Sequence, residues 1–181
     1  MSSLQSDNER LRVQVQQLRA HEEIRKRLHG YTRALDRLDR PLLTEQFWPD
    51  ARVDYGAFYH GSVAGFVNAA MRFQNAMHGT QHLVDGVTVS LSGSTADVES
   101  YIHATHLLMD GSGLVQLSVG ARYVDRFERR NLTWRLSFRT EIMDSGRWIR
   151  IPERWRGLAC ELPRGLRGRT DLAQRFSLLE P

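Results

Sequence analysis

The sequence has 181 residues, of which 41% are hydrophobic, and its formal net charge is +4. This length and composition predict a single domain that can bury a core and still enclose a cavity. The excess positive charge is concentrated in residues 147–181, where eight Arg accompany four acids. The rest of the chain alternates Arg with Asp and Glu and carries no basic stripe, so we expect no nucleic-acid partner.

The only cysteine, Cys160, excludes an intramolecular disulfide and a cysteine-based metal cluster. A reducing compartment, by default the cytoplasm, is therefore expected. The first residues lack the pattern of a signal peptide, and no apolar run is long enough to span a bilayer. We expect a cytoplasmic protein without a membrane partner.

Residues 3–39 are predicted to form a helix, because apolar residues recur at helical spacing and Pro is absent. Leu4, Leu11 and Leu18 are seven residues apart, which is the spacing of a short coiled-coil seam. A solvated extension that packs on a neighbouring subunit is the open alternative. Residues 1–20 are thus expected to be an N-terminal helical extension, and the protein a homo-oligomer, either a dimer or a trimer.

Pro41 is expected to end this helix and to open a second, short one, with Asp39 or Arg40 as the cap. Residues 51–59 alternate, with Val53 and Tyr55 on one side, and predict a strand. Residues 62–77 carry apolar residues at helical spacing and predict a third helix.

From His82 onward the apolar pattern has period two over residues 83–91, 96–109, 114–127 and 133–143, with turn residues between the segments. Helices followed by hairpin-linked strands predict an α+β fold. We expect a cone-shaped α+β barrel, in which helices pack on a strongly curved, mixed, mostly antiparallel sheet around an internal pocket. This domain is expected over residues 21–150, and residues 151–181 are expected to be an irregular, Arg-rich tail over the surface or the cavity mouth.

Histidine is the commonest general base, and two histidines lie four residues apart at His78 and His82. On a helix this spacing would suit a metal ion, with His103 or His106 completing the site. Gly79 argues against a helix there, and no HExxH-type motif is present. We therefore expect neither a metal nor a cofactor.

His103 and His106 have opposite parity in a predicted strand, so only one of them can face the interior. His106 shares its face with apolar and small residues, namely Ala96, Val98, Ser100, Ile102, Ala104 and Leu108. His106 is thus the pocket candidate, and a core histidine with a purely structural role is the open alternative.

Two carboxylates, Asp36 and Asp39, lie near the end of the first predicted helix. Helical geometry alone slightly favours Asp39 for the interior, because Asp36 lies farther round from the apolar stripe. Asp39 has a sufficient structural role as a helix cap, whereas Asp36 has none.

Four segments together resemble the SnoaL-like branch of the nuclear transport factor 2-like superfamily, over roughly residues 20–148. They are Tyr31 with Asp36 and Asp39, the run Phe47-Trp48-Pro49-Asp50-Ala51, the run His78-Gly79-Thr80-Gln81-His82, and residues 123–130 before Trp134. The chain is similar to lyases of this family such as hexachlorocyclohexane dehydrochlorinase and bile acid 7α-dehydratase, and more remotely to scytalone dehydratase and polyketide cyclases.

The resemblance implies four catalytic residues. Asp36 and His82 match the aspartate–histidine dyad of the dehydrochlorinase. Arg139 falls where that enzyme places a leaving-group arginine, and Tyr31 falls where the dehydratase places a catalytic tyrosine.

The resemblance also implies three substrate-binding residues. Tyr55 resembles a pocket tyrosine of the dehydratases, and His106 lies near a polar pocket position that varies within the family. Trp48, in the Phe-Trp-Pro-Asp-Ala run, is the third.

The implied activity is a cofactor-free elimination on a small, mostly apolar, polyketide-, steroid- or terpenoid-like substrate. His82 would remove a proton from carbon, and Asp36 would orient its imidazole. A polyketide cyclase or isomerase with the same dyad remains an alternative. A non-catalytic ligand-binding protein, or an assembly protein like an oxygenase β subunit, is another, because the fold alone does not decide function.

Overall fold

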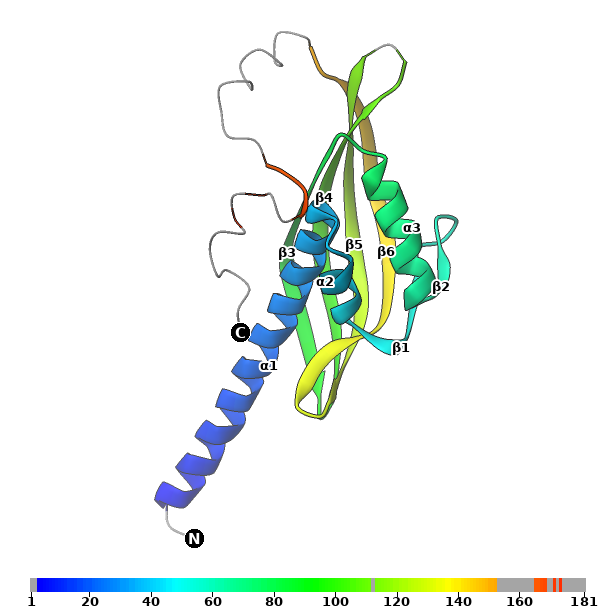
Figure 1. The fold of residues 1–181 in the computed structure, drawn as a ribbon. Coiled ribbons are helices and arrows are strands. Elements are labelled where there is room, and N and C mark those ends of the chain that lie inside the picture. The colour runs from blue at the N-terminus through cyan, green and yellow to red at the C-terminus, as the bar shows by residue number, and fades with distance from the viewer. Residues whose placement is uncertain (1–2, 112, 153–164, 169–170, 172, 174–181) are drawn as a thin grey trace.

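The computed structural model describes residues 3–111, 113–152, 165–168, 171 and 173. Helix α1 spans Ser3–Arg37, and its C-terminal half lies along the sheet while its N-terminal half projects away from it (Figure 1). The buried side chains of α1 include Ile24, Leu28, Tyr31 and Leu35, which recur at helical spacing. The predicted apolar stripe is therefore the face by which α1 packs on the domain.

Helix α1 ends two residues earlier than predicted because Leu38 adopts a left-handed conformation with φ of 55°. The chain then turns, and the backbone N–H of Asp39 donates to the carbonyl oxygen of Ala34 at 2.9 Å. The Asp39 carboxylate caps the six-residue helix α2 (Arg40–Glu45) by accepting from the backbone N–H of Leu42 at 3.0 Å. Asp39 is thus confirmed as the cap.

Two short strands and a helix follow α2. Strand β1 is Phe47–Asp54, and β2 is His60–Ser62. The predicted strand over residues 51–59 was therefore wrong at both ends, since residues 55–59 form the turn between β1 and β2. Helix α3 is Val63–Asn75, with Ser62 as its N-cap.

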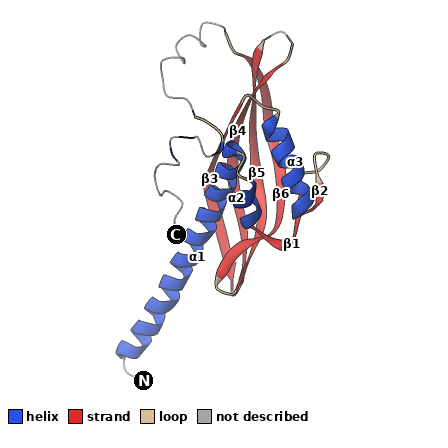
Figure 2. Cartoon of the chain, in the orientation of Figure 1, coloured by secondary structure: helices blue, strands red, loops and turns tan. Residues whose placement is uncertain are grey.

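Four long strands complete the sheet: β3 (Gly79–Ser92), β4 (Thr95–Met109), β5 (Leu114–Arg130) and β6 (Thr133–Arg150). The order is β2-β1-β6-β5-β4-β3, and only the β1–β6 pair is parallel. The helices lie against this sheet (Figure 2). The mixed, mostly antiparallel α+β fold is confirmed, and the sheet is curled but not closed, because β2 and β3 are its edges.

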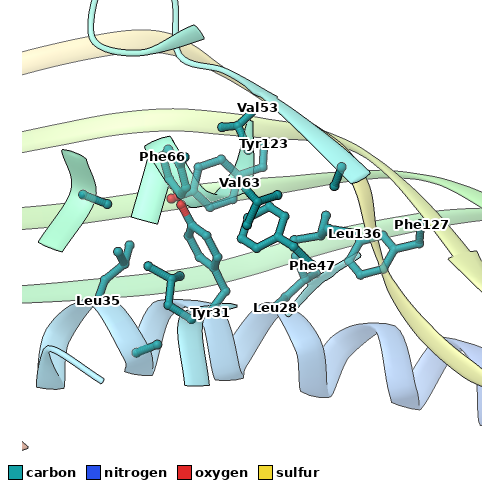
Figure 3. Close-up of a cluster of buried hydrophobic side chains, with 14 of the residues drawn as sticks. Leu28, Tyr31, Leu35, Phe47, Val53, Val63, Phe66, Tyr123, Phe127 and Leu136 are labelled. Carbon is teal, nitrogen blue, oxygen red and sulfur yellow. The ribbon is translucent and has the colours of Figure 1, made fainter. Parts of the chain in front are cut away.

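The core lies between the helices and the concave face of the sheet. Tyr31 from α1, Phe66 from α3 and Tyr123 from β5 meet there, as Figure 3 shows. Tyr31 stacks on Phe66 with ring centroids 6.4 Å apart and meets Tyr123 edge-on at 5.6 Å. Aromatic rings thus join the two layers directly.

Strand β6 contains a β-bulge that changes which residues face the core. Phe127 pairs with Leu136, but the neighbouring Arg126 pairs with Phe138, so Ser137 is an extra residue. Before the bulge the even-numbered Trp134 and Leu136 are buried, whereas after it Arg139 is buried. The bulge therefore moves odd-numbered residues of β6 to the inner face.

The two ends of the chain lie beyond this core. Residues 4–19 of α1 are exposed, including the heptad-spaced Leu4, Leu11 and Leu18, so oligomerisation through them stays a prediction. The irregular tail was expected over residues 151–181, and β6 continues up to Arg150. Most of residues 151–181 lie outside the described residues. Within the described part, no helix is both long and apolar enough to cross a membrane.

Candidate active site

A cavity of about 250 Å³ lies between the helices and the curled sheet. Most of its wall is apolar or aromatic, and its polar lining residues include Gln74, His82, His106 and Glu141. The aromatic lining residues are Tyr31, Tyr55, Phe58, Phe66, Phe73 and Tyr123. A largely apolar cavity with a few polar groups is the usual form of a small-molecule site.

Asp36 and His82 meet at the wall of this cavity, because the end of α1 packs against the start of β3. The Asp36 Oδ1 atom lies 2.7 Å from His82 Nδ1, and Oδ2 accepts the His82 backbone N–H at 3.0 Å. Thr80 Oγ1 donates to Oδ1 at 3.1 Å. An ionised Asp36 therefore holds the proton of the imidazole on Nδ1 and leaves Nε2 as the basic atom.

Asp36 is shielded from solvent and from the cavity by these contacts. Its side chain is 12% exposed, that of His82 is 5% exposed, and only His82 is among the residues lining the cavity. The carboxylate thus contacts the histidine and not a ligand. This is the arrangement of a base and its orienting group.

His106 faces the cavity, and His103 lies on the opposite, exposed side of β4. The ring centroids of His106 and His82 are 5.2 Å apart with an interplanar angle of 84°. His106 Nδ1 is buried without a hydrogen-bond partner among the described residues. Burial, assisted by the nearby His82, lowers the pKa of His106 to about 4, so its imidazole is neutral near pH 7.

Two tyrosines from distant parts of the chain share a hydrogen bond in the cavity wall. The phenol oxygens of Tyr31 and Tyr55 lie 2.7 Å apart. Burial raises the pKa of Tyr31 to about 12, although the nearby Arg139 opposes this shift, and burial also raises the pKa of Tyr55. Both phenols are therefore neutral hydrogen-bond donors near pH 7.

Arg139, which was expected to contact a leaving group, is not among the described residues that line the cavity, and that contact stays a prediction. Its side chain is fully buried and forms a bidentate ion pair with Asp125, with distances of 2.7 and 2.6 Å. Its guanidinium carbon lies 4.1 Å from the ring centroid of Tyr31 and 3.9 Å from that of Tyr123. The tyrosine rings thus separate Arg139 from the cavity, and it acts on them through cation–π contacts.

Trp48 was expected to bind substrate, and this stays a prediction. Its indole N–H donates to the backbone oxygen of Glu128 at 3.0 Å. The guanidinium carbons of Arg130 and Arg135 lie 5.0 and 5.2 Å from its ring centroid. Trp48 is not among the described residues that line the cavity, and it packs beside these arginines.

Three polar site residues were missed from the sequence. Thr80 supports Asp36, Gln74 lines the cavity from α3, and Glu141 lines it from β6. Glu141 follows Arg139 by two residues, but a period-two pattern that starts at Leu136 puts both of them on the outer face. The bulge at Ser137 reverses that assignment.

Short pieces of the C-terminal segment lie close to the site. Arg167 donates from Nη1 to the backbone oxygen of Gln74 at 2.9 Å, and Asp171 Oδ2 lies 3.7 Å from Nε of Arg37. These contacts bring the segment to the ends of α1 and α3. Across the described ranges, no group of three or more His, Cys, Asp or Glu side chains is arranged to hold a metal ion.

Residues 16–140 match the SnoaL-like domain family. No curated protein sequence matches the chain.

Three solved structures show the same fold at low identity. Hexachlorocyclohexane dehydrochlorinase LinA-type3 from Novosphingobium barchaimii is 17% identical, with a TM-score of 0.65 over 77% of this chain and 98% of that chain. A candidate scytalone dehydratase from Novosphingobium aromaticivorans is also 17% identical, with a TM-score of 0.62 over 75% and 91%. Protein Kfla4162 from Kribbella flavida is 18% identical, with a TM-score of 0.65 over 70% and 92%.

Proposed function

Because the chain belongs to the SnoaL-like family, whose fold it shares with a dehydrochlorinase and a candidate scytalone dehydratase, we propose that it is a lyase of the dehydratase type. In this proposal His82 removes a proton from a carbon next to a carbonyl group, and a hydroxyl group leaves the neighbouring carbon. The reaction needs no cofactor, since side chains supply the base and the hydrogen-bond donors.

The observation that carries the proposal is the double contact between Asp36 and His82. An imidazole with its proton held on Nδ1 presents Nε2 as a base and can stabilise the positive charge that it gains. The apolar wall around it strengthens this charge stabilisation, because few solvent dipoles screen it.

The pair Tyr31 and Tyr55 is proposed to bind the carbonyl oxygen of the substrate. Negative charge develops on that oxygen as the proton leaves carbon, and preplaced phenols would stabilise it. Arg139 would assist from behind the rings by its positive charge. His106, which is neutral, would contact the substrate near His82.

The proposed substrate is a small, mostly apolar molecule of the polyketide, steroid or terpenoid type. The cavity volume of about 250 Å³ favours a compact ring system, and the aromatic wall favours a flat one. A β-hydroxy ketone on such a ring combines the acidic C–H, the carbonyl oxygen and the leaving group that the site would need.

The test is a panel of cyclic β-hydroxy ketones incubated with the purified protein, with loss of water followed by mass spectrometry. His82→Ala is expected to lower turnover by about 10³-fold, within the range of general-base catalysis. The matched control is His103→Ala, which removes an imidazole from the exposed face of the neighbouring strand and should leave turnover unchanged. Wild-type turnover that survives His82→Ala would contradict the dyad mechanism.

An isomerase or a polyketide cyclase would begin with the same proton removal, so the panel should also be analysed for products of unchanged mass. In D₂O, reversal of this proton removal would exchange deuterium into the carbon next to the carbonyl group of the substrate, and the exchange should require His82. Binding without either reaction would instead indicate a ligand-binding protein.

A further inference from the structure

Glu141 is the only carboxylic acid among the described residues that line the cavity. Asp36, the acid of the dyad, lies behind His82 and does not line it. No described residue forms a hydrogen bond or ion pair with the Glu141 carboxyl group. A carboxyl group that lines a largely apolar cavity and has no partner in the protein is expected to find one in the bound ligand.

Glu141 lies across the sheet from the dyad. It is on β6, where it pairs with Tyr123 of β5, whereas His82 is on β3, and the strand order is β6-β5-β4-β3. Burial raises the pKa of the Tyr31, Tyr55 and Tyr123 phenols, and the nearby Glu141 adds to the shift of each. Glu141 therefore lies near the three tyrosines, and β5 and β4 separate its strand from that of His82.

The surroundings of Glu141 raise the pKa of its carboxyl group above the usual value. Burial raises the pKa of its carboxyl group, and the positive charge of Arg139 and that of a protonated His82 offset this only in part. A neutral carboxylic acid in an apolar cavity is a hydrogen-bond donor and a proton source, whereas the ionised form can only accept.

We propose that Glu141 contacts the substrate and protonates its departing oxygen, while His82 takes the proton from the adjacent carbon. This rests on the dehydratase function proposed above. The electrons of the C–H bond form the C=C bond, those of the C–O bond leave with oxygen, and the oxygen takes the Glu141 proton and departs as water. Glu141 is left as carboxylate and His82 as imidazolium, and proton return from His82 to Glu141 restores both.

This assignment divides the polar groups of the cavity into three roles. His82 is the base, the Tyr31–Tyr55 pair binds the carbonyl oxygen, and Glu141 protonates the leaving hydroxyl. The substrate class is accordingly a compact β-hydroxy ketone whose two oxygens both point to the β6 side of the cavity.

The first test needs no substrate. The infrared spectrum of the protein near pH 7 is expected to contain the carbonyl stretch of a protonated carboxylic acid, and Glu141→Gln should remove it. Glu99→Gln, on the outer face of β4, is the matched control and should leave the band in place. Absence of the band, or its survival in Glu141→Gln, would overturn the proposal.

The second test compares two probes of the same size, cyclohexanol and cyclohexylammonium, by calorimetric titration. A neutral Glu141 donates to the hydroxyl oxygen, so Glu141→Leu is expected to weaken cyclohexanol binding about fivefold, the effect of one lost hydrogen bond. Glu141→Gln, whose amide still donates, should retain it. Tighter binding of cyclohexylammonium than of cyclohexanol, lost in Glu141→Leu, would instead show an ionised carboxylate and overturn the proposal.

The third test uses the β-hydroxy ketone that the wild-type protein dehydrates fastest. Glu141→Gln is expected to lower kcat by about 100-fold or more with KM within about threefold, because the amide donates a hydrogen bond but no proton. Glu141→Asp should recover part of kcat. An unchanged kcat in Glu141→Gln would refute the role of Glu141 but not that of His82, whereas failure of every substrate would refute the dehydratase function and with it the proton transfer from Glu141.

Discussion

Both carboxylate oxygens of Asp36 contact His82, one at the ring Nδ1 at 2.7 Å and the other at the backbone N–H at 3.0 Å. A single side chain therefore fixes the ring and the backbone of the same residue. Rotation of the imidazole would break the first contact while the second remained. The orientation of the His82 imidazole therefore depends on how α1 packs against β3.

Asp36→Asn keeps the size of the side chain and removes its negative charge, so it tests the orienting role of the carboxylate. The amide can accept one hydrogen bond, but its NH₂ group faces donors, so the imidazole is expected to adopt the other tautomer and lose its base at Nε2. We expect turnover to fall by about 10³- to 10⁴-fold, as in hydrolase triads. The free energy of unfolding should fall by about 1–2 kcal/mol. Kinetics and urea denaturation measure the two effects, and equal turnover in wild type and variant would contradict them.

Asp39→Ala is expected to lower stability without lowering turnover. The Asp39 carboxylate caps α2 and lies outside the cavity lining, so its removal should cost about 1 kcal/mol of stability. Turnover at a temperature where the variant is folded should match that of the wild type. Urea denaturation and the same kinetic assay check this, and a large loss of turnover would mean that Asp39 acts in the site.

Arg139→Met should destabilise the protein strongly, because it leaves Asp125 buried without its partner. Breaking a buried ion pair by removing one partner typically costs about 3–5 kcal/mol. The double variant Arg139→Met/Asp125→Leu should recover much of this loss, since no unpaired charge then remains. Denaturant unfolding of the three variants measures the effect.

The matched control for this ion pair is Arg126→Met. Arg126 and Asp97 form an ion pair at 2.8 Å, but their side chains are 54% and 65% exposed. Exposed pairs contribute at most about 1 kcal/mol, so this variant should unfold close to the wild-type midpoint. Similar losses in Arg126→Met and Arg139→Met would show that burial of the Arg139 pair is unimportant.

His106 should make the protein less stable in mild acid. Its folded-state pKa of about 4 lies below the usual 6.5, so the unfolded chain binds the proton first as the pH falls. The stability present above pH 6.5 is therefore lost progressively between pH 6.5 and 4, by about 3 kcal/mol. His106→Leu should lose less stability over this range, as measured by urea denaturation at several pH values.

His103→Leu is the control for this pH dependence, because it removes an imidazole from the exposed side of the same strand. Its stability should change with pH as that of the wild type does. If His106→Leu and His103→Leu respond to acid equally, the lowered pKa of His106 does not contribute to acid sensitivity.

Most of the fold could be predicted from periodicity. The stripe that includes Ile24, Leu28, Tyr31 and Leu35 has helical spacing and is the buried face of α1. The alternation in β4 correctly assigned His106 to the interior and His103 to the exterior. These assignments succeed because, within one uninterrupted helix or strand, the direction of a side chain follows from its position in the sequence.

The choice between Asp36 and Asp39 shows where prediction from residue spacing fails. A helix continued to residue 39 would have favoured Asp39 for the interior. Leu38 leaves the helical conformation, however, so helical spacing does not give the direction of the Asp39 side chain. The capping role of Asp39 was readable from the sequence because a cap is a local interaction. The contact of Asp36 with His82 joins residues 46 positions apart and depends on how α1 packs on β3.

The sequence by itself determined the helices, the long strands and the candidates Asp36, His82, Tyr31 and Tyr55, since local spacing and family motifs carry that information. Tertiary structure alone decided which of them meet, and it placed Arg139 behind the tyrosines and Glu141 in the cavity. One extra residue, Ser137, reverses the facing of β6, and its presence shows only in the pairing with β5. A bulge is a relation between two strands, and therefore a period-two pattern in one strand cannot reveal it.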